Sequence, residues 1–308
     1  MNRPLVSVII NCYNGEPFLR KALESVRVQS YAEWEIIFWD NASTDSSAAI
    51  AQAFGPQLRY FKSPETLPLG AARNKALAEA RGVYVTILDC DDTLLPHALE
   101  TLVGALEGNR CALAYAGVVL VDSTGREIRR QIPKARGGNL LAVQLRKYEI
   151  GVPAVMIRRQ VLIEDALGFD PALRIAEDYC LFMQIAAAHE ICARPEVLAR
   201  YLVHPGALTQ KTMAYWGDEV EYTLKLLAAK HPGLRDRHKA GFRMAHAQAA
   251  YYRARYYAAQ RQRGKALKAL VKYLYVDYRY PILFLLLLLP LSIWDFIHER
   301  RSARSFRT

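Results

Sequence analysis

The sequence predicts an α/β domain with a mostly parallel central sheet, followed by a helical C-terminal part. Apolar runs rich in β-forming residues alternate with helical patterns through residues 5–103, which is the order of a parallel sheet with crossover helices. Three of these runs end in polar or acidic segments, so the segments are expected at one edge of the sheet. Beyond residue 216, helical patterns replace the strands.

The predicted elements follow one another with short connections. Buried strands are expected at residues 5–10, 34–39, 58–61 and 83–88. Helices are expected at residues 16–29, 48–54, 69–80 and 94–103. A turn signal at residues 122–125 predicts a hairpin, and the later elements are strands 112–121, 127–132, 152–157 and 191–203 and a helix at 176–189.

The chain is expected to divide into an α/β domain at 1–210, a helical hairpin at 211–272 and a membrane anchor with a basic tail at 273–308. The anchor prediction depends on the apolar residues 281–297, which Pro290, Ser292 and Asp295 interrupt. A full crossing needs about 20 apolar residues, so a re-entrant or interfacial anchor fits better. The alternative is a buried helical hairpin or a dimer contact.

Composition and charge favour a membrane surface over nucleic acid. The net charge is +11, and much of it lies in the C-terminal third beside the apolar run. No helix or base-stacking motif that would read nucleic acid is evident. The apolar run at residues 6–10 is too short for a signal peptide, so the cytoplasmic face of the membrane is expected.

The five cysteines predict reduced thiols. Their number is odd and they contain no C-x-x-C pair, which indicates neither a disulfide framework nor a zinc site. They are Cys12, Cys90, Cys111, Cys180 and Cys192.

Three carboxylates, Asp89, Asp91 and Asp92, follow the apolar strand at 83–88. Crowded carboxylates raise one another's pKa unless a cation lies between them, and hard oxygen ligands suit Mg²⁺ or Mn²⁺. The sequence therefore predicts a divalent metal that holds phosphate. The alternative is an acidic turn in which Asp92 or Thr93 caps the helix at 94–103.

Five motifs occur in register along about the first 205 residues, at 6–14, 36–45, 70–74, 88–92 and 177–178. Together they resemble the family 2 glycosyltransferases, whose GT-A fold has a Rossmann-like sheet with flanking helices. The Gln-x-x-Arg-Trp motif of processive synthases is missing after residue 178. The resemblance therefore implies a non-processive enzyme, and the basic and apolar C-terminal part predicts that it is membrane-associated.

The resemblance also implies site residues. Asp178 matches the catalytic base, with Glu177 orienting it; the alternative is that both acids only favour the helix N-terminus. His204 occurs where relatives place a histidine near the diphosphate, although a structural histidine at a strand end is equally expected. The nucleotide-binding candidates are Asn11, Tyr13, Asn14, Asp40, Arg73 and Asp89, and the metal candidates are Asp91, Asp92 and His204.

The function expected from the resemblance is inverting transfer of one sugar, of the hexosyltransferase type and metal-dependent. The donor is expected to be a UDP-sugar and the acceptor a saccharide or lipid-linked saccharide, in cell-envelope or surface-polysaccharide synthesis. One alternative is a catalytically degenerate scaffold at the membrane. Another is a nucleotidyltransferase, which the sequence disfavours because the loop after the first strand, residues 11–16, is neither basic nor Gly-rich.

Overall fold

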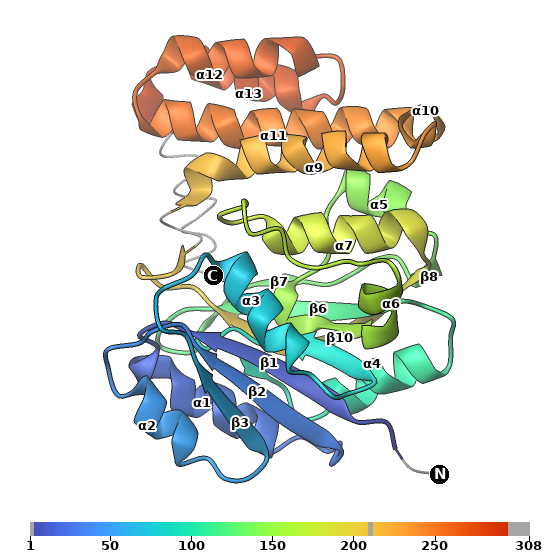
Figure 1. The fold of residues 1–308 in the computed structure, drawn as a ribbon. Helices are drawn as coiled ribbons and strands as arrows, with labels where there is room; N and C mark the ends of the chain where they lie inside the picture. The colour runs from blue at the N-terminus through green and yellow to red at the C-terminus, as the bar shows by residue number, and fades with distance from the viewer. Residues whose placement is uncertain (1–2, 209–211, 295–308) are drawn as a thin grey trace. The chain divides into compact units, whose positions relative to one another are not determined.

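The computed structural model describes residues 3–208 and 212–294. The chain forms two compact units, the first made of Met1–Leu140 and Glu149–Val203 and the second of Leu141–Tyr148 and His204–Thr308. The first unit contains the sheet, and the second is helical (Figure 1).

The N-terminal strands are parallel, as predicted. β1 (Val6–Cys12) lies between β2 (Trp34–Asp40) and β4 (Tyr84–Ile87), and β3 (Leu58–Lys62) pairs with β2. Their carboxyl ends therefore meet at one edge of the sheet.

The rest of the sheet is mixed, so the prediction of a mostly parallel sheet was wrong beyond β4. β9 (Val155–Arg158) runs antiparallel to both β4 and β6 (Leu113–Val121), and β10 (Ile191–Leu202) is parallel to β6. The predicted hairpin is present, since β7 (Glu127–Gln131) pairs antiparallel with β6. β8 (Gly137–Gly138) pairs with β10, and the 3-10 turn η1 (Val152–Ala154) precedes β9.

Helices cover both faces of the parallel strands (Figure 1). On one face, α1 (Glu16–Arg27), α2 (Ser47–Gln52) and α4 (Ala98–Glu107) share a core with alternate residues of β1, because successive side chains of a strand point to opposite faces. On the other face, α3 (Leu69–Ala78) packs against β1 and β2. The unit also contains α6 (Arg159–Glu164) and α7 (Glu177–Ala188).

The acidic turn after β4 does not cap a helix, which corrects the alternative raised for Asp92 and Thr93. Thr93 and Leu94 form β5 (Thr93–Leu94), which pairs antiparallel with β10. α4 begins at Ala98, with His97 at its N-cap. Tertiary strand pairing overrides the local capping signal here.

The expectation of five reduced thiols was also wrong. Cys111 and Cys192 form a disulfide across 81 residues of sequence, with their Cα atoms 5.8 Å apart. Cys111 precedes β6 and Cys192 lies in β10, so the register of two neighbouring strands brings them together. Cys12, Cys90 and Cys180 remain thiols outside this disulfide.

The second unit is a set of helices whose longest member is α11 (Lys239–Ala259). α9 (Trp216–Lys230) and α12 (Arg263–Leu270) pack against α11. A break separates α9 from α11, where Gly233 takes a positive φ of 77°. The other elements are α5 (Leu141–Arg146), η2 (Met213–Tyr215), α10 (Leu234–Arg237), η3 (Val271–Tyr273) and α13 (Arg279–Leu288).

Within residues 3–208 and 212–294, no helix combines the length and the apolar character needed to cross a membrane. The predicted anchor spans 273–308; of its apolar run at 281–297, residues 295–297 lie outside the described residues, as does the rest of the chain to residue 308.

Candidate active site

The predicted site residues of the first unit come from the carboxyl edge of the parallel strands and from α3 and α7. Asn11 is the penultimate residue of β1, Asp40 ends β2, and Asp89 to Asp92 follow β4. Arg73 lies on α3, and Glu177 opens α7.

A buried arginine joins two of these elements. The Arg73 side chain is only 2% exposed, and it donates hydrogen bonds to Asp89 Oδ1 at 2.5 Å and to Glu177 Oε1 at 2.7 Å. Its guanidinium also lies 5.4 Å from the ring centroid of Phe169. Burial opposes the charge, but Asp89 and Glu177 outweigh burial and raise the pKa of Arg73. The structure therefore brings together two predicted acids, Asp89 and Glu177, that are far apart in the sequence.

Asp178 lies beside this ion pair in the first turn of α7. Burial and the negative charge of Glu177 raise its pKa to about 7, whereas Arg73 and the hydrogen bond from the Tyr179 N–H oppose the shift. A carboxyl group with a pKa near the working pH can both accept and release a proton. The predicted role of Asp178 as the base, with Glu177 orienting it, stays a prediction.

The carboxylates after β4 are crowded. Asp92 is almost fully buried; its Oδ1 accepts a hydrogen bond from the Leu202 N–H at 2.9 Å, and its Oδ2 has no partner among the described residues. Burial, then Asp91 and Asp89, raise the pKa of Asp92 well above its ordinary value. A cation beside these oxygens would relieve the repulsion.

The carboxylate oxygens of Asp91 and Asp92 fit a divalent ion that binds together with a diphosphate. No cluster of three metal-ligating side chains is assembled within the part of the chain that the structure describes. Mg²⁺ is usually held through one or two carboxylates, with substrate phosphates and water as the other ligands. The buried, unpartnered oxygen of Asp92 and the adjacent Asp91 meet that description.

The loop after β1 is tied to the loop after β2. The Asn14 N–H donates to Ser43 Oγ at 3.1 Å, and Asn14 Oδ1 accepts from the Thr44 N–H at 2.9 Å. Asn14 adopts a positive φ of 52°, which asparagine tolerates better than most residues. Tyr13 next to it is exposed.

Asn11 is 7% exposed, and neither its Nδ2 nor its Oδ1 has a hydrogen-bond partner among the described residues. A buried amide without partners is costly unless a ligand or water completes it. This fits the predicted nucleotide-binding role of Asn11.

Asp40 is completely buried and shapes the loop that follows it. Its Oδ1 accepts from the Ser43 N–H at 2.7 Å, and its Oδ2 accepts from the Tyr60 hydroxyl at 2.6 Å. The observed contacts therefore assign Asp40 a positioning role, and its predicted role in nucleotide binding stays a prediction.

His204 begins the second compact unit, where its C=O accepts a hydrogen bond from the Ala207 N–H. Its predicted role at the metal stays a prediction.

Sequence reasoning missed a pair of hydrogen bonds that joins α3 to the loop before α7. Asn74 donates through Nδ2 to the Phe169 C=O at 2.7 Å and accepts the Phe169 N–H at 2.8 Å. A Cβ on Gly70 would lie 2.9 Å from the Asp170 C=O oxygen, so only glycine permits this approach. The signal was present, because Gly70 and Asn74 begin and end the motif that contains Arg73.

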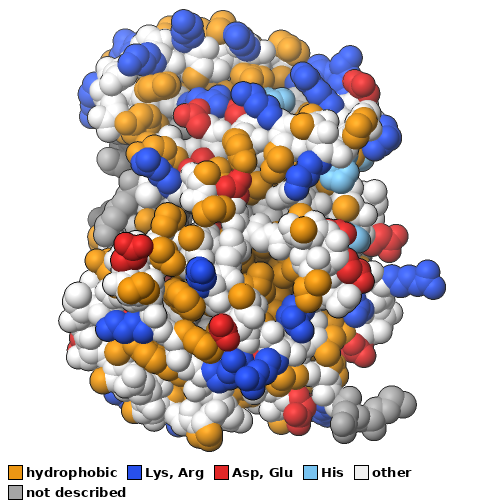
Figure 2. Space-filling view, viewed as in Figure 1, with side chains coloured by type: hydrophobic (Ala, Val, Ile, Leu, Met, Phe, Trp, Pro, Cys, Tyr) orange, Lys and Arg blue, Asp and Glu red, His pale blue; other side chains and the backbone are white. Residues whose placement is uncertain are grey.

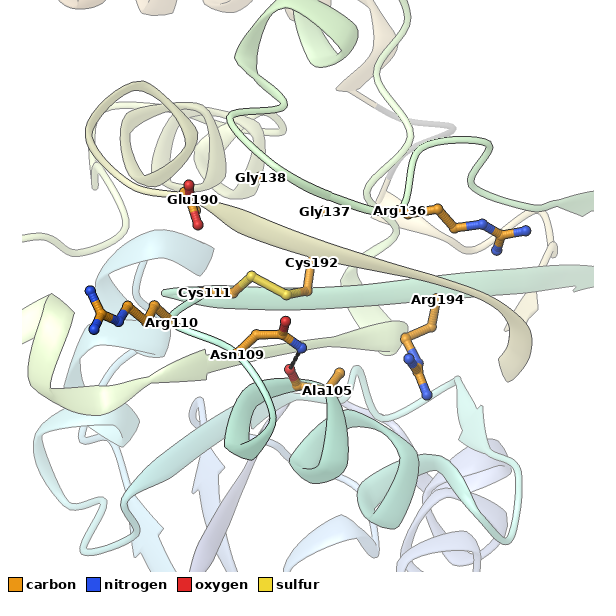
Figure 3. Close-up of a pocket in the computed structure, with 10 residues that line it drawn as sticks. All are labelled: Ala105, Asn109, Arg110, Cys111, Arg136, Gly137, Gly138, Glu190, Cys192 and Arg194. Carbon is orange, nitrogen blue, oxygen red and sulfur yellow. Dashed lines mark hydrogen bonds between the residues drawn. A yellow bond between two sulfur atoms is a disulfide. The ribbon is translucent and has the colours of Figure 1, made fainter.

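A pocket of about 380 Å³ lies away from these acids, at the amino ends of β6 and β10. It adjoins the Cys111–Cys192 disulfide and includes Arg110, Arg136 and Arg194 (Figure 3). The three arginine side chains point in different directions in Figure 3, so they do not form a converging anion site. β6 is parallel to β4, which places this pocket at the edge opposite the carboxylates.

Comparison with known proteins identifies the family. The sequence model of glycosyl transferase family 2 matches residues 7–165, which include the motifs at the ends of β1, β2 and β4. The chain belongs to this family. Its fold is the GT-A type, with a mixed central sheet and flanking helices.

Family 2 relatives occur in bacteria and archaea. The chain is 28% identical to the succinoglycan biosynthesis protein ExoO of Rhizobium meliloti, over 65% of this chain and 61% of that protein. It is 29% identical to the uncharacterized glycosyltransferase MJ1057 of Methanocaldococcus jannaschii, over 66% of this chain and 72% of that protein.

Two solved structures share the fold. TarS of S. aureus, in complex with UDP-GlcNAc, has a TM-score of 0.68 and 17% identity over 96% of this chain and 91% of that chain. The mannosyltransferase PcManGT of Pyrobaculum calidifontis, in complex with GDP-Man and Mn²⁺, has a TM-score of 0.60 and 20% identity over 99% of this chain and 87% of that chain.

Proposed function

We propose that this family 2 glycosyltransferase moves one sugar from a nucleotide-sugar to a saccharide or lipid-linked acceptor, with inversion at the anomeric carbon. The observation that carries the proposal is the buried Arg73, which holds Asp89 and Glu177 beside an Asp178 whose pKa is raised to about 7. The proposed donor is a UDP-sugar.

Asp178 is the proposed general base. As the acceptor hydroxyl attacks the anomeric carbon from the face opposite the leaving group, the hydroxyl proton passes to the Asp178 carboxylate, and the bond from the anomeric carbon to the diphosphate oxygen breaks. Glu177 is paired with Arg73 at 2.7 Å, and its negative charge helps to raise the pKa of Asp178.

Asp91 and Asp92 are the proposed metal ligands of this chain, together with His204. Bound Mg²⁺ or Mn²⁺ would neutralise charge that develops on the departing nucleoside diphosphate. Asn11, with its unpartnered amide, and the loop that Asn14 and Asp40 hold together would bind the nucleotide.

The relatives support the substrate class but not one donor. TarS is described with UDP-GlcNAc, PcManGT with GDP-Man and Mn²⁺, and ExoO in succinoglycan biosynthesis. We therefore propose a role in surface-polysaccharide synthesis, non-processive and located at the cytoplasmic face of the membrane. The basic and apolar character of residues 261–294 supports this location.

The first test is donor binding. Calorimetry with a panel of nucleotide-sugars, with and without Mn²⁺, is expected to give metal-dependent binding of a UDP-sugar that Asp91→Asn abolishes. Asp236→Asn removes an exposed carboxylate of α10 and serves as the control, with unchanged binding expected. Binding of no donor by the wild-type chain would favour the degenerate scaffold instead.

A further inference from the structure

Helix α13 is apolar on two opposite faces. One face is buried in a core with α11 and α12 that contains Tyr280 and Leu287. Leu283, Phe284 and Leu286 are partly buried against the same core. A helix that is apolar all round is normally covered all round, so the opposite face needs a partner.

The opposite face is exposed. Ile282, Leu285 and Leu288 recur three residues apart and are 51%, 60% and 51% exposed. Such spacing puts them on one side of the helix. The exposed set continues beyond both ends of α13, with Tyr275 at 73%, Tyr278 at 76%, Leu289 at 44% and Ile293 at 38%. Exposed apolar residues that form one contiguous stripe mark an interaction surface.

Charge around the stripe indicates an anionic partner. Residues 261–279, which lead into α13, contain six basic residues and one acidic residue: Arg261, Arg263, Lys265, Lys268, Lys272 and Arg279, against Asp277. Lys268 and Lys272 are exposed. Figure 2 shows Lys and Arg side chains gathered over the helices of this unit at the top of the view.

Exposed tyrosines lie at the N-terminal end of the apolar stripe. Tyr275 and Tyr278, at 73% and 76% exposed, precede the first turn of α13. Tyrosine favours the headgroup level of a bilayer because its ring is apolar and its hydroxyl is polar. A stripe of aliphatic residues that exposed tyrosines and lysines precede in the sequence is the pattern of a helix that lies in the plane of a membrane interface.

We propose that α13 docks in the plane of an anionic lipid bilayer through the stripe formed by Tyr278, Ile282, Leu285 and Leu288, with Lys268 and Lys272 contacting lipid phosphates. The proposal rests on the membrane location proposed above and names the surface responsible for it. It is independent of donor binding and of catalysis by Asp178.

The test is flotation of the full chain with lipid vesicles. Binding is expected to vesicles that contain phosphatidylglycerol and to be much weaker for pure phosphatidylcholine. The triple variant Ile282→Ser, Leu285→Ser, Leu288→Ser is expected to weaken binding by at least about tenfold, because apolar burial drives insertion. Lys268→Gln and Lys272→Gln are expected to weaken it by about fivefold each.

A matched control removes three similarly exposed apolar residues of the first unit, Val83, Ile132 and Ile163, which are 52%, 42% and 55% exposed. Replacing these three with serine is expected to leave vesicle binding unchanged. All variants alter exposed side chains, and circular dichroism checks that they fold.

Three outcomes would overturn the proposal. Binding that the triple variant retains would move the contact to another surface while leaving the membrane location intact. If the full chain binds no vesicle of either composition, both the proposed surface and the proposed membrane location are wrong, whatever the donor-binding panel shows. The full chain could instead fail to bind vesicles and form a dimer in solution, while the triple variant stays monomeric. That result would assign the stripe to contact with a second copy of the protein.

Discussion

Apolar side chains are usually buried and charged side chains exposed, and two regions of this protein depart from that pattern. The carboxyl edge of the sheet buries charged side chains, whereas the outer face of α13 exposes apolar ones. At the sheet edge, the paired side chains of Arg73 and Glu177 are buried, each at 2% exposure. On α13, Leu285 is 60% exposed. Buried charges persist where they are paired, and exposed apolar surface persists where a partner covers it. The charges of Arg73 and Glu177 are therefore paired within the fold, whereas the exposed face of α13 is the surface for which we propose a lipid partner.

The largest expected effect on stability comes from breaking the buried pairs. Arg73→Met is expected to lower the free energy of unfolding by about 3–5 kcal/mol, because it leaves Asp89 and Glu177 without their cation. Urea unfolding at neutral pH measures the change.

The control for that variant is Arg59→Met. Arg59 is paired with Glu35 at 3.2 Å and with Glu79 at 3.4 Å, but its side chain is 24% exposed. Water screens such a pair, so a loss of about 1 kcal/mol is expected. Equal losses in the two variants would contradict the view that the Arg73 pairs owe their effect to burial.

The second expected effect is that kcat/KM depends on pH through the Asp178 carboxyl. The pKa of Asp178 is raised from 3.8 to about 7, so the base is protonated at lower pH, and kcat/KM is expected to fall about tenfold per pH unit below pH 7. Initial rates across pH 5–9 measure it. A flat profile through pH 7 would remove Asp178 from the base role.

The same shift has a consequence for stability. A carboxyl whose folded-state pKa is raised contributes stability below its unfolded pKa, and that contribution is lost as pH rises through about 7. Asp178→Asn is therefore expected to unfold at a higher temperature than the wild type above pH 7, with the difference shrinking toward pH 4.

The smallest effect is expected on α13. The variant Ile282→Ser, Leu285→Ser, Leu288→Ser is expected to change the free energy of unfolding by no more than about 0.5 kcal/mol per site, because these side chains are already largely in water. A loss of several kcal/mol in the absence of lipid would show that the stripe packs against the protein itself.

Local patterns predicted the parallel strands and placed Asp40 and Asp89 at strand ends, because strand ends are encoded by neighbouring residues. Contacts across long stretches of sequence were not predictable in the same way. The pairing of Arg73 with Glu177 joins residues 104 apart, the disulfide joins residues 81 apart, and Asp92 is engaged by Leu202 rather than by the next helix. The motifs identify residues of the site from the sequence alone. The Cys111–Cys192 disulfide depends instead on the register of β6 and β10, and the contact of Asp92 with Leu202 depends on the position of β10; no local pattern contains either.

The most direct measurement is donor turnover by Asp178→Asn, with donor affinity measured on the same sample. The structure predicts affinity within about twofold of wild type, because Arg73 keeps its contacts with Asp89 and Glu177. It predicts that transfer falls by about a thousandfold, within the usual range for a lost general base. Transfer at a near-normal rate in Asp178→Asn would contradict the account.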